Sequence, residues 1–179
     1  MDFLLLPSPC FAEKGMDKAN YPVTPAVRLL REKRIVFEPH IYAYEERGGT
    51  KRSAEELQVD EHAVIKTLVM ETDSREPLIV LMHGDREVST RELARTLGIK
   101  RVSPCDPDVA QKHTGYQIGG TSPFGTRKAL PVYAEKTIFD LPVIYINGGK
   151  RGFLVSIDSN DLRRALGVLE VNVAIGQTK

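Results

Sequence analysis

Short apolar runs alternate with polar loops along the chain, and the runs predict strands. Residues 65–70 and 78–82 are mainly apolar, and runs of this length suit a buried strand better than a buried helix. The polar residues 72–76 between them have the length of a hairpin loop. Residues 37–44 predict another strand, which Pro39 confines to an edge or a bulge. Further strands are expected near residues 132–134, 143–146 and 153–157.

Capping residues mark the starts of the expected helices, and glycines mark several of their ends. Thr24 before Pro25 is typical of an N-cap followed by proline in the first turn. The capping-box pattern Ser-x-x-Glu begins at Ser53 and again at Ser89. Helices are therefore expected over residues 24–33, 53–58, 89–98, 107–115 and 159–167, the last capped by Ser159.

The order of these elements predicts a mixed sheet. The strand pairs 65–70/78–82 and 143–146/153–157 have hairpin-length connections, whereas parallel neighbours need a crossover of a dozen or more residues. We therefore expect a mixed α/β fold with a mixed, partly barrel-like β-sheet and surrounding helices. The sequence shows no internal repeat and no dividing linker. Residues 23–175 are expected to form a single domain, preceded by an N-terminal extension over residues 1–22.

Composition narrows the function classes. The 179 residues are 41% hydrophobic and 27% charged, which is typical of an ordinary globular protein. A formal net charge of +1 lacks the strongly basic signature of a duplex-binding module, so DNA is not an expected partner. Two cysteines give no disulfide framework. The first residues lack the basic start of a signal peptide and the length of a membrane span. We expect a cytoplasmic protein without a membrane partner.

Neither a metal site nor a familiar nucleophile can be assembled from the sequence. The histidines at positions 40, 62, 83 and 113 are dispersed, and no Cys-x-x-Cys occurs, so we expect no metal and no cofactor. Cys105 stands in a turn-rich context with His113 as its nearest candidate base, which favours an inert, partly buried thiol. Ser122 does not lie in a Gly-x-Ser-x-Gly pattern.

The stretch GYQIGGTSPFGTRK, residues 115–128, is rich in glycine. Residues 120–125 have the glycine spacing of a P-loop, but Thr126-Arg127 follows where Lys-Ser/Thr is required, which excludes an ATPase. A glycine-rich backbone without a nucleophile can still act on a reactive ester. It positions the ester and stabilises the developing oxyanion with N–H groups.

Lys66 interrupts the apolar run of its predicted strand. Strand periodicity alone favours a Lys66 that faces solvent, since lysine is rarely buried without a partner. In the alternative, Lys66 points into a pocket and meets a phosphate or a developing negative charge.

Several of these segments together resemble the YbaK/EbsC family. Residues 115–125 are similar to the family motif Gly-Tyr-x-x-Gly-Gly-x-Ser-Pro-x-Gly. The resemblance covers about residues 24–167 in the right order. The other matching segments are Thr24-Pro25-Ala26, His40-x-Tyr42, Lys66-Thr67-Leu68, Ala110-Gln111-Lys112 and Gly148-Gly149-Lys150-Arg151-Gly152.

The family consists of free-standing relatives of the editing domain inserted in bacterial prolyl-tRNA synthetases. The resemblance implies a trans-editing aminoacyl-tRNA deacylase that hydrolyses mischarged Cys-tRNA(Pro), with prolyl-tRNA synthetase as a partner. It also implies substrate assistance, in which the substrate's thiol attacks its own ester and no protein nucleophile is needed. The alternatives are a deacylase for another mischarged tRNA, such as Ala-tRNA(Pro), and a non-catalytic tRNA- or nucleotide-binding module.

The resemblance also implies roles for individual residues. Lys66 takes the catalytic role, in contact with the tRNA terminus or the reacting ester. Family members often have serine in place of Asn147 and a polar residue near Leu154, so these two positions bear on substrate preference. The expected substrate-binding residues are Tyr42, Thr67, Gly119, Gly120, Ser122, Pro123, Gly125 and Asn147, and the expected tRNA-binding cations are Arg127, Lys128, Lys150 and Arg151.

Overall fold

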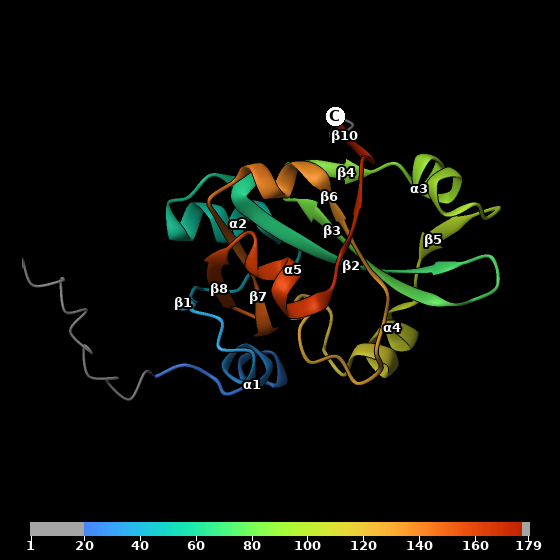
Figure 1. Cartoon of the computed structure of the whole chain (residues 1–179). Coiled ribbons are helices and arrows are strands. Elements are labelled where there is room, and N and C mark those ends of the chain that lie inside the picture. The colour runs from blue at the N-terminus through green and yellow to red at the C-terminus, as the bar shows by residue number, and fades with distance from the viewer. Residues whose placement is uncertain (1–19, 177–179) are drawn as a thin grey trace, which may run out of the picture.

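The apolar runs of the sequence form a mixed sheet of eight strands at the centre of the molecule (Figure 1). The computed structural model describes residues 20–176. The strands run in the order β1-β8-β7-β2-β3-β6-β9, with β5 also on β2. They are β1 (Glu38–Ile41), β2 (Val64–Thr72), β3 (Pro77–His83), β5 (Val102–Pro104), β6 (Val132–Glu135), β7 (Val143–Lys150), β8 (Phe153–Asp158) and β9 (Leu169–Val171). A separate pair joins β4 (Arg86–Val88) to β10 (Ala174–Gly176).

Strand pairing confirms the mixed sheet and both expected hairpins. β2 pairs with β3, and β7 with β8, in antiparallel fashion. β2 with β7, β3 with β6 and β6 with β9 are parallel pairs. β1 is an edge strand that pairs with β8, which agrees with Pro39 at its second position. Strands β4, β5, β9 and β10 were not expected, because three residues each are too few for a periodic pattern.

Five α-helices surround the sheet, and α2 and α3 lie on opposite sides of the molecule with β2 running between them (Figure 1). The predicted cap at Thr24 is confirmed, since its Oγ1 accepts the Val27 N–H at 3.1 Å. None of the helices in residues 20–176 is long and apolar enough to cross a membrane. The helices are α1 (Pro25–Glu32), α2 (Gly49–Leu57), α3 (Thr90–Leu97), α4 (Pro107–Thr114) and α5 (Asp161–Leu166), and η1 (Glu61–Ala63) and η2 (Lys136–Asp140) are 3₁₀ turns.

Two predicted helix starts are wrong. α2 begins at Gly49, and Ser53 lies buried inside it, with its hydroxyl donating to the Thr50 carbonyl instead of capping. The N-cap of α5 is Asn160, not Ser159. β8 extends to Asp158, whose carboxylate accepts the Asn160 N–H at 2.9 Å and so takes over the polar role expected of Ser159.

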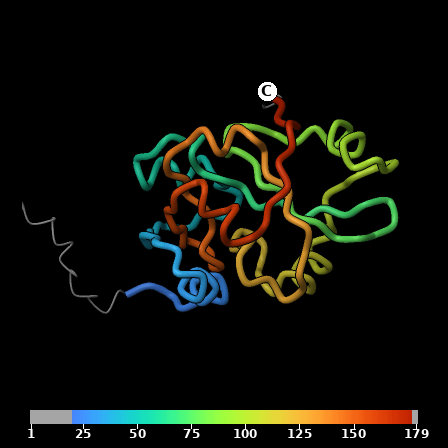
Figure 2. Tube along the Cα trace, in the orientation of Figure 1, coloured from blue at the N-terminus to red at the C-terminus, as the bar shows by residue number. Residues whose placement is uncertain are grey.

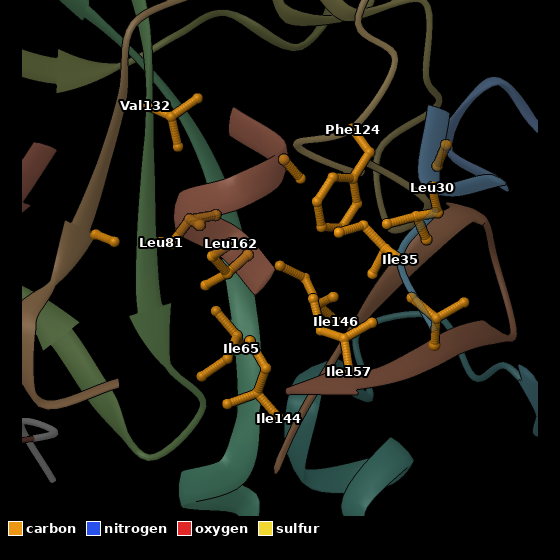
Figure 3. Close-up of a cluster of buried hydrophobic side chains, with 14 of the residues drawn as sticks. Leu30, Ile35, Ile65, Leu81, Phe124, Val132, Ile144, Ile146, Ile157 and Leu162 are labelled. Atoms are coloured by element: carbon orange, nitrogen blue, oxygen red, sulfur yellow. The ribbon is translucent and has the colours of Figure 1, made fainter. Parts of the chain in front are cut away.

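The main hydrophobic core lies between the sheet and the helices α1 and α5. Phe124, from the glycine-rich segment, is fully buried in it beside Leu30 and Ile35 (Figure 3). This segment follows α4 and lies beside α1, although the two are about a hundred residues apart (Figure 2). Tyr21 stacks on Phe153 at 5.9 Å between ring centroids, so the packed part of the chain includes this residue of the expected extension. Residues 1–19 of that extension lie outside the described residues.

We expect Phe124→Ala to destabilise the fold by about 3–5 kcal/mol, because it removes a fully buried ring that anchors the glycine-rich segment. Urea unfolding measures this change in the free energy of unfolding. Val36→Ala is the control, since Val36 is 83% exposed and its truncation should stay within about 0.5 kcal/mol. A loss below about 1 kcal/mol for Phe124→Ala would contradict the anchoring role.

Candidate functional site

A cavity of about 600 Å³ lies along β2. Lys66 and its neighbours in β2 form one part of the lining. The segment from Tyr42 to Ser53 forms a second part, and residues Pro104 to Ala110 form a third. The glycine-rich segment contributes Ile118, Gly119 and Thr121, and the β7–β8 hairpin contributes Asn147, Arg151 and Leu154.

The edge of β2 in this cavity lacks a continuous partner strand. The parallel pairing with β7 covers Val64 and Ile65 and goes no further. The antiparallel pairing with β5 begins at Met70, with one more bond from the Cys105 N–H to the Val69 carbonyl at 3.0 Å. Between these two partners, Thr67 faces a gap in the sheet. The backbone there can hydrogen-bond a ligand.

Lys66 is half-buried and lines the cavity. Burial lowers the pKa of its ammonium, and the carboxylates of Glu61, Glu87 and Asp85 oppose that shift from a distance. Among residues 20–176, no carboxylate forms an ion pair with Lys66. A partly desolvated ammonium without a fixed counter-ion is available to a negatively charged group of a ligand.

Two polar side chains of the β7–β8 hairpin hold the glycine-rich segment against the cavity. Asn147 donates through Nδ2 to the Gly119 carbonyl at 3.2 Å. Arg151 donates through Nε to the Ile118 carbonyl at 2.8 Å, and its guanidinium lies 5.2 Å from the centre of the Tyr44 ring. The cavity wall at residues 118–119 is therefore fixed by side chains far away in the sequence.

Close packing explains why glycine occupies positions 119 and 120. Gly119 has a φ of +81°, and a Cβ there would lie 2.6 Å from the Tyr44 hydroxyl. A Cβ on Gly120 would lie 2.8 Å from the Arg151 backbone nitrogen. Both glycines thus let the segment approach the β7–β8 hairpin and its neighbours.

The structure brings some of the expected site residues together and leaves others apart. Lys66, Tyr42, Thr67, Gly119, Asn147 and Arg151 all line the cavity. Gly120, Ser122, Pro123 and Gly125 are not part of its lining. Ser122 is fully buried, and its Oγ accepts the Phe124 N–H at 3.3 Å. Gly125 packs on the Pro25 carbonyl. Ser122 and Gly125 thus contribute to the packing of the glycine-rich segment and not to the cavity lining.

The remaining expected cations lie away from the cavity lining. Arg127 is near Gly115 and donates to the Lys112 carbonyl at 3.4 Å. Lys128 donates its backbone N–H to the His113 carbonyl, beside α4. Lys150 is exposed and directly precedes Arg151 in the β7–β8 hairpin.

The lining also contains residues that sequence reasoning missed. Tyr44, Arg52 and Ile118 line the cavity, and no short motif in the sequence singles them out. Cys105 lines it as well. Burial and the Glu71 carboxylate raise the pKa of the Cys105 thiol, which disfavours the nucleophilic thiolate.

The described residues contain no cluster of three His, Cys, Asp or Glu side chains arranged to hold a metal ion. None of the histidines contributes to the cavity lining. His83 is fully buried and bonds through both ring nitrogens, to the His62 carbonyl and the Thr137 hydroxyl. His40 bonds to the Ser156 hydroxyl at 2.9 Å.

Comparison with known proteins identifies the family. Residues 45–165 match the model of the aminoacyl-tRNA editing domain. The chain belongs to this family. Editing domains of this kind deacylate aminoacyl-tRNA, and the cavity along β2 is the candidate active site for that reaction.

Proteins of similar sequence include a candidate deacylase and proline–tRNA ligases. A candidate Cys-tRNA(Pro)/Cys-tRNA(Cys) deacylase, EbsC, from Enterococcus faecalis is 27% identical over 141 residues, which cover 78% of this chain and 86% of the relative. A proline–tRNA ligase from Geotalea daltonii is 31% identical over 116 residues, but these are 63% of this chain and 18% of the ligase. The chain thus corresponds to a small part of that synthetase.

Solved structures confirm the editing-domain fold. The structure of a candidate trans-editing enzyme for prolyl tRNA synthetase superimposes with a TM-score of 0.74 at 19% identity, over 87% of this chain and 100% of that one. A hypothetical protein of known structure gives a TM-score of 0.78 at 18% identity, over 85% of this chain and all of that one.

We expect Gly119→Ala to reduce deacylation on the order of tenfold or more, because the new methyl group displaces Tyr44 and the cavity wall. Rates of amino acid release measure this effect. Gly167→Ala is the matched control: Gly167 also has a positive φ, +58°, but has nothing within 4 Å of the added Cβ. Both variants carry a left-handed backbone cost of about 1–2 kcal/mol. Equal activity in the two variants would contradict the steric role of Gly119.

Proposed function

We propose that the protein hydrolyses mischarged Cys-tRNA(Pro) in trans. The observation that carries this proposal is the cavity along β2, which holds free backbone groups and an ammonium without an ion-pair partner among residues 20–176. Its lining offers no nucleophilic side chain coupled to a general base. Such a site suits a labile ester whose own side chain supplies the nucleophile. The relationship to EbsC, whose name specifies Cys-tRNA(Pro) and Cys-tRNA(Cys), supports cysteine as the amino acid.

The proposed reaction needs no group that the cavity lacks. The substrate's thiol sulfur attacks the ester carbonyl carbon of the same cysteine, and the carbonyl oxygen becomes an oxyanion. Collapse of this intermediate breaks the bond to the ribose oxygen, which takes up the proton that the thiol lost. The products are a cyclic thioester of cysteine and tRNA with a free hydroxyl, and water then opens the ring to give cysteine.

Lys66 stabilises negative charge in this proposal. Its ammonium is held on β2 with no carboxylate in ion-pair distance among residues 20–176, so it can meet the terminal phosphate or the developing oxyanion. Partial burial strengthens that interaction relative to an exposed lysine.

The tRNA approaches from the β7–β8 hairpin in this proposal. Arg151 lines the cavity and Lys150 lies next to it on the surface. Arg127 and Lys128 extend the expected contact toward α4. A net charge of +1 gives little non-specific affinity for RNA. A partner would therefore help to deliver the substrate, and we propose prolyl-tRNA synthetase in the cytoplasm for that role.

The proposal is tested by incubating the protein with Cys-tRNA(Pro), Ala-tRNA(Pro) and Pro-tRNA(Pro) and following release of each amino acid. We expect release of cysteine well above the uncatalysed rate, with prolyl-tRNA spared. Faster release of alanine would replace the cysteine assignment with an alanine-specific one. No release of any amino acid would leave a binding module.

We expect Lys66→Ala to reduce Cys-tRNA(Pro) deacylation by about a hundredfold or more, the scale for losing one electrostatic stabiliser. Lys100→Ala is the control, because Lys100 is exposed and lies outside the cavity lining. Near-normal activity of Lys66→Ala would remove Lys66 from the mechanism.

The charge of Lys66 gives a second readout. Since burial lowers its pKa, the ammonium is fully present below that pKa and is lost as the pH rises through it. The kcat/KM of the wild type should therefore fall at a lower alkaline pH than that of Lys66→Arg, which keeps its charge.

We expect Lys150→Gln to weaken tRNA binding and to lower the slope of log affinity against log salt by about one, because one cation no longer releases a counter-ion. Lys150 suits this test since it is exposed and, unlike Arg151, holds no carbonyl of the cavity wall. Lys100→Gln is the matched control. An unchanged slope for Lys150→Gln would place the tRNA elsewhere.

A further inference from the structure

The gap beside Thr67 is built into the sheet. Strand alternation points the N–H and C=O of Thr67 to the same edge as those of Val69, whose carbonyl accepts from Cys105. Neither β7 nor β5 pairs with Thr67 on that edge. Outside the strand ladders, no backbone group within residues 20–176 forms a hydrogen bond with Thr67. Both hydrogen-bonding groups therefore face the cavity.

Pro107 prevents a continuation of β5 from filling the gap beside Thr67. The β5 register, Met70 opposite Pro104 and Glu71 opposite Ser103, would place Pro107 opposite Thr67 if it continued. Proline has no N–H to donate to the Thr67 carbonyl. It instead begins α4, which turns the chain away from β2.

Asn147 prevents β7 from filling the gap beside Thr67. Continuing the parallel β7 ladder by one step would direct the Gly149 N–H to the Thr67 carbonyl. The Asn147 side chain takes that donor instead, since its Oδ1 accepts the Gly149 N–H at 2.7 Å. The register of β7 against β8 shifts between Asn147 and Lys150, and the pairing of β7 with β2 ends at Ile146.

We propose that the amino acid of the substrate enters this gap as a strand of one residue. An aminoacyl ester carries an ammonium donor and a carbonyl acceptor on the same residue. These match the C=O and N–H of Thr67 as a hydrogen-bonded pair of an antiparallel ladder does. The Thr67 N–H donates to the ester carbonyl oxygen and, when the carbonyl is attacked, to the oxyanion. The Thr67 C=O accepts from the α-ammonium. This inference rests on the proposed deacylase function.

The same pairing decides where the substrate's side chain lies. Residues opposite each other in a ladder project to the same face, so the substrate's side chain lies on the Thr67 face of β2. Thr67 Oγ1 is buried there without a hydrogen-bond partner among the described residues. It is therefore available to the substrate's thiol, whereas the methyl group of alanine offers it nothing.

Lys66 then lies on the opposite face of β2, beside the ester and not beside the amino acid side chain. Arg151 and Asn147, across the cavity, flank the side from which the nucleotide arrives. One strand thus separates two tasks: Thr67 holds the amino acid, and Lys66 meets the charge of the terminal nucleotide or of the oxyanion.

Replacing the Thr67 amide by an ester tests the proposed donor. Translation with the α-hydroxy analogue of threonine at position 67 changes the N–H to an oxygen and keeps the side chain. We expect deacylation of Cys-tRNA(Pro) to fall by about a hundredfold, the cost of one oxyanion donor, with the melting temperature close to the control's. The control carries the same backbone change at Lys100, which is exposed and outside the cavity lining.

Retention of wild-type activity by the position-67 ester would overturn the proposal. An equal loss of activity in an ester at position 69 would overturn it too, since the substrate would then not be paired specifically with Thr67. If the wild type itself released no amino acid, the proposed function would fail instead, so the two failures are distinguishable.

Thr67→Val tests the side-chain contact separately. It keeps the shape of the residue but removes the hydroxyl. We expect the preference for Cys-tRNA(Pro) over Ala-tRNA(Pro), as a ratio of kcat/KM values, to fall about tenfold, roughly the worth of one hydrogen bond. A structural defect would lower both rates together. An unchanged ratio would exclude Thr67 from recognition of the thiol.

Discussion

The interruption of strand pairing along β2 is the constraint on which the candidate site depends. β2 is a central strand, paired with β3 over seven residues, yet its other edge changes partner from β7 to β5 and leaves Thr67 between them. Unpaired backbone groups inside a domain cost free energy unless a ligand or water satisfies them. The gap, the cavity and the position of Lys66 follow from this change of partner.

Much of the surrounding structure keeps this gap from closing. Pro107 cannot donate, and Asn147 captures the Gly149 N–H while it also holds the Gly119 carbonyl. The glycine-rich segment forms the wall across from β2, held by Arg151 in front and by the buried Phe124 ring behind. This explains why a segment with so many glycines has a fixed position. The glycines allow the segment to lie close to the β7–β8 hairpin, and side chains from that hairpin and from the core hold it there.

The sequence predicted the fold better than the site. Continuous apolar runs predicted β2, β3, β7 and β8, and the hairpin-length loops excluded a purely parallel sheet. A predicted helix cap was wrong where a neighbouring residue accepts the backbone hydrogen bond instead, as Asp158 does in place of Ser159. Lys66 was singled out because it interrupts an apolar run, and its pKa shift reflects burial. Tyr44 and Pro107 could not be placed at the cavity, because the change of strand partner on β2 is a long-range feature that no local pattern encodes. Likewise, the motif residues Ser122 and Gly125 support the wall without lining the cavity.

Amide hydrogen exchange at Thr67 tests this account most directly. The measurement uses the whole chain, free and saturated with cysteinyl-adenosine in which an amide replaces the labile ester. The Leu68 N–H, which points to β3 by alternation, serves as the internal reference. The account predicts that the Thr67 N–H exchanges fast in the free protein and slows by at least about tenfold in the complex, while Leu68 is slow in both. A Thr67 N–H that is already protected in the free protein, or that stays unprotected at saturation, would contradict the account.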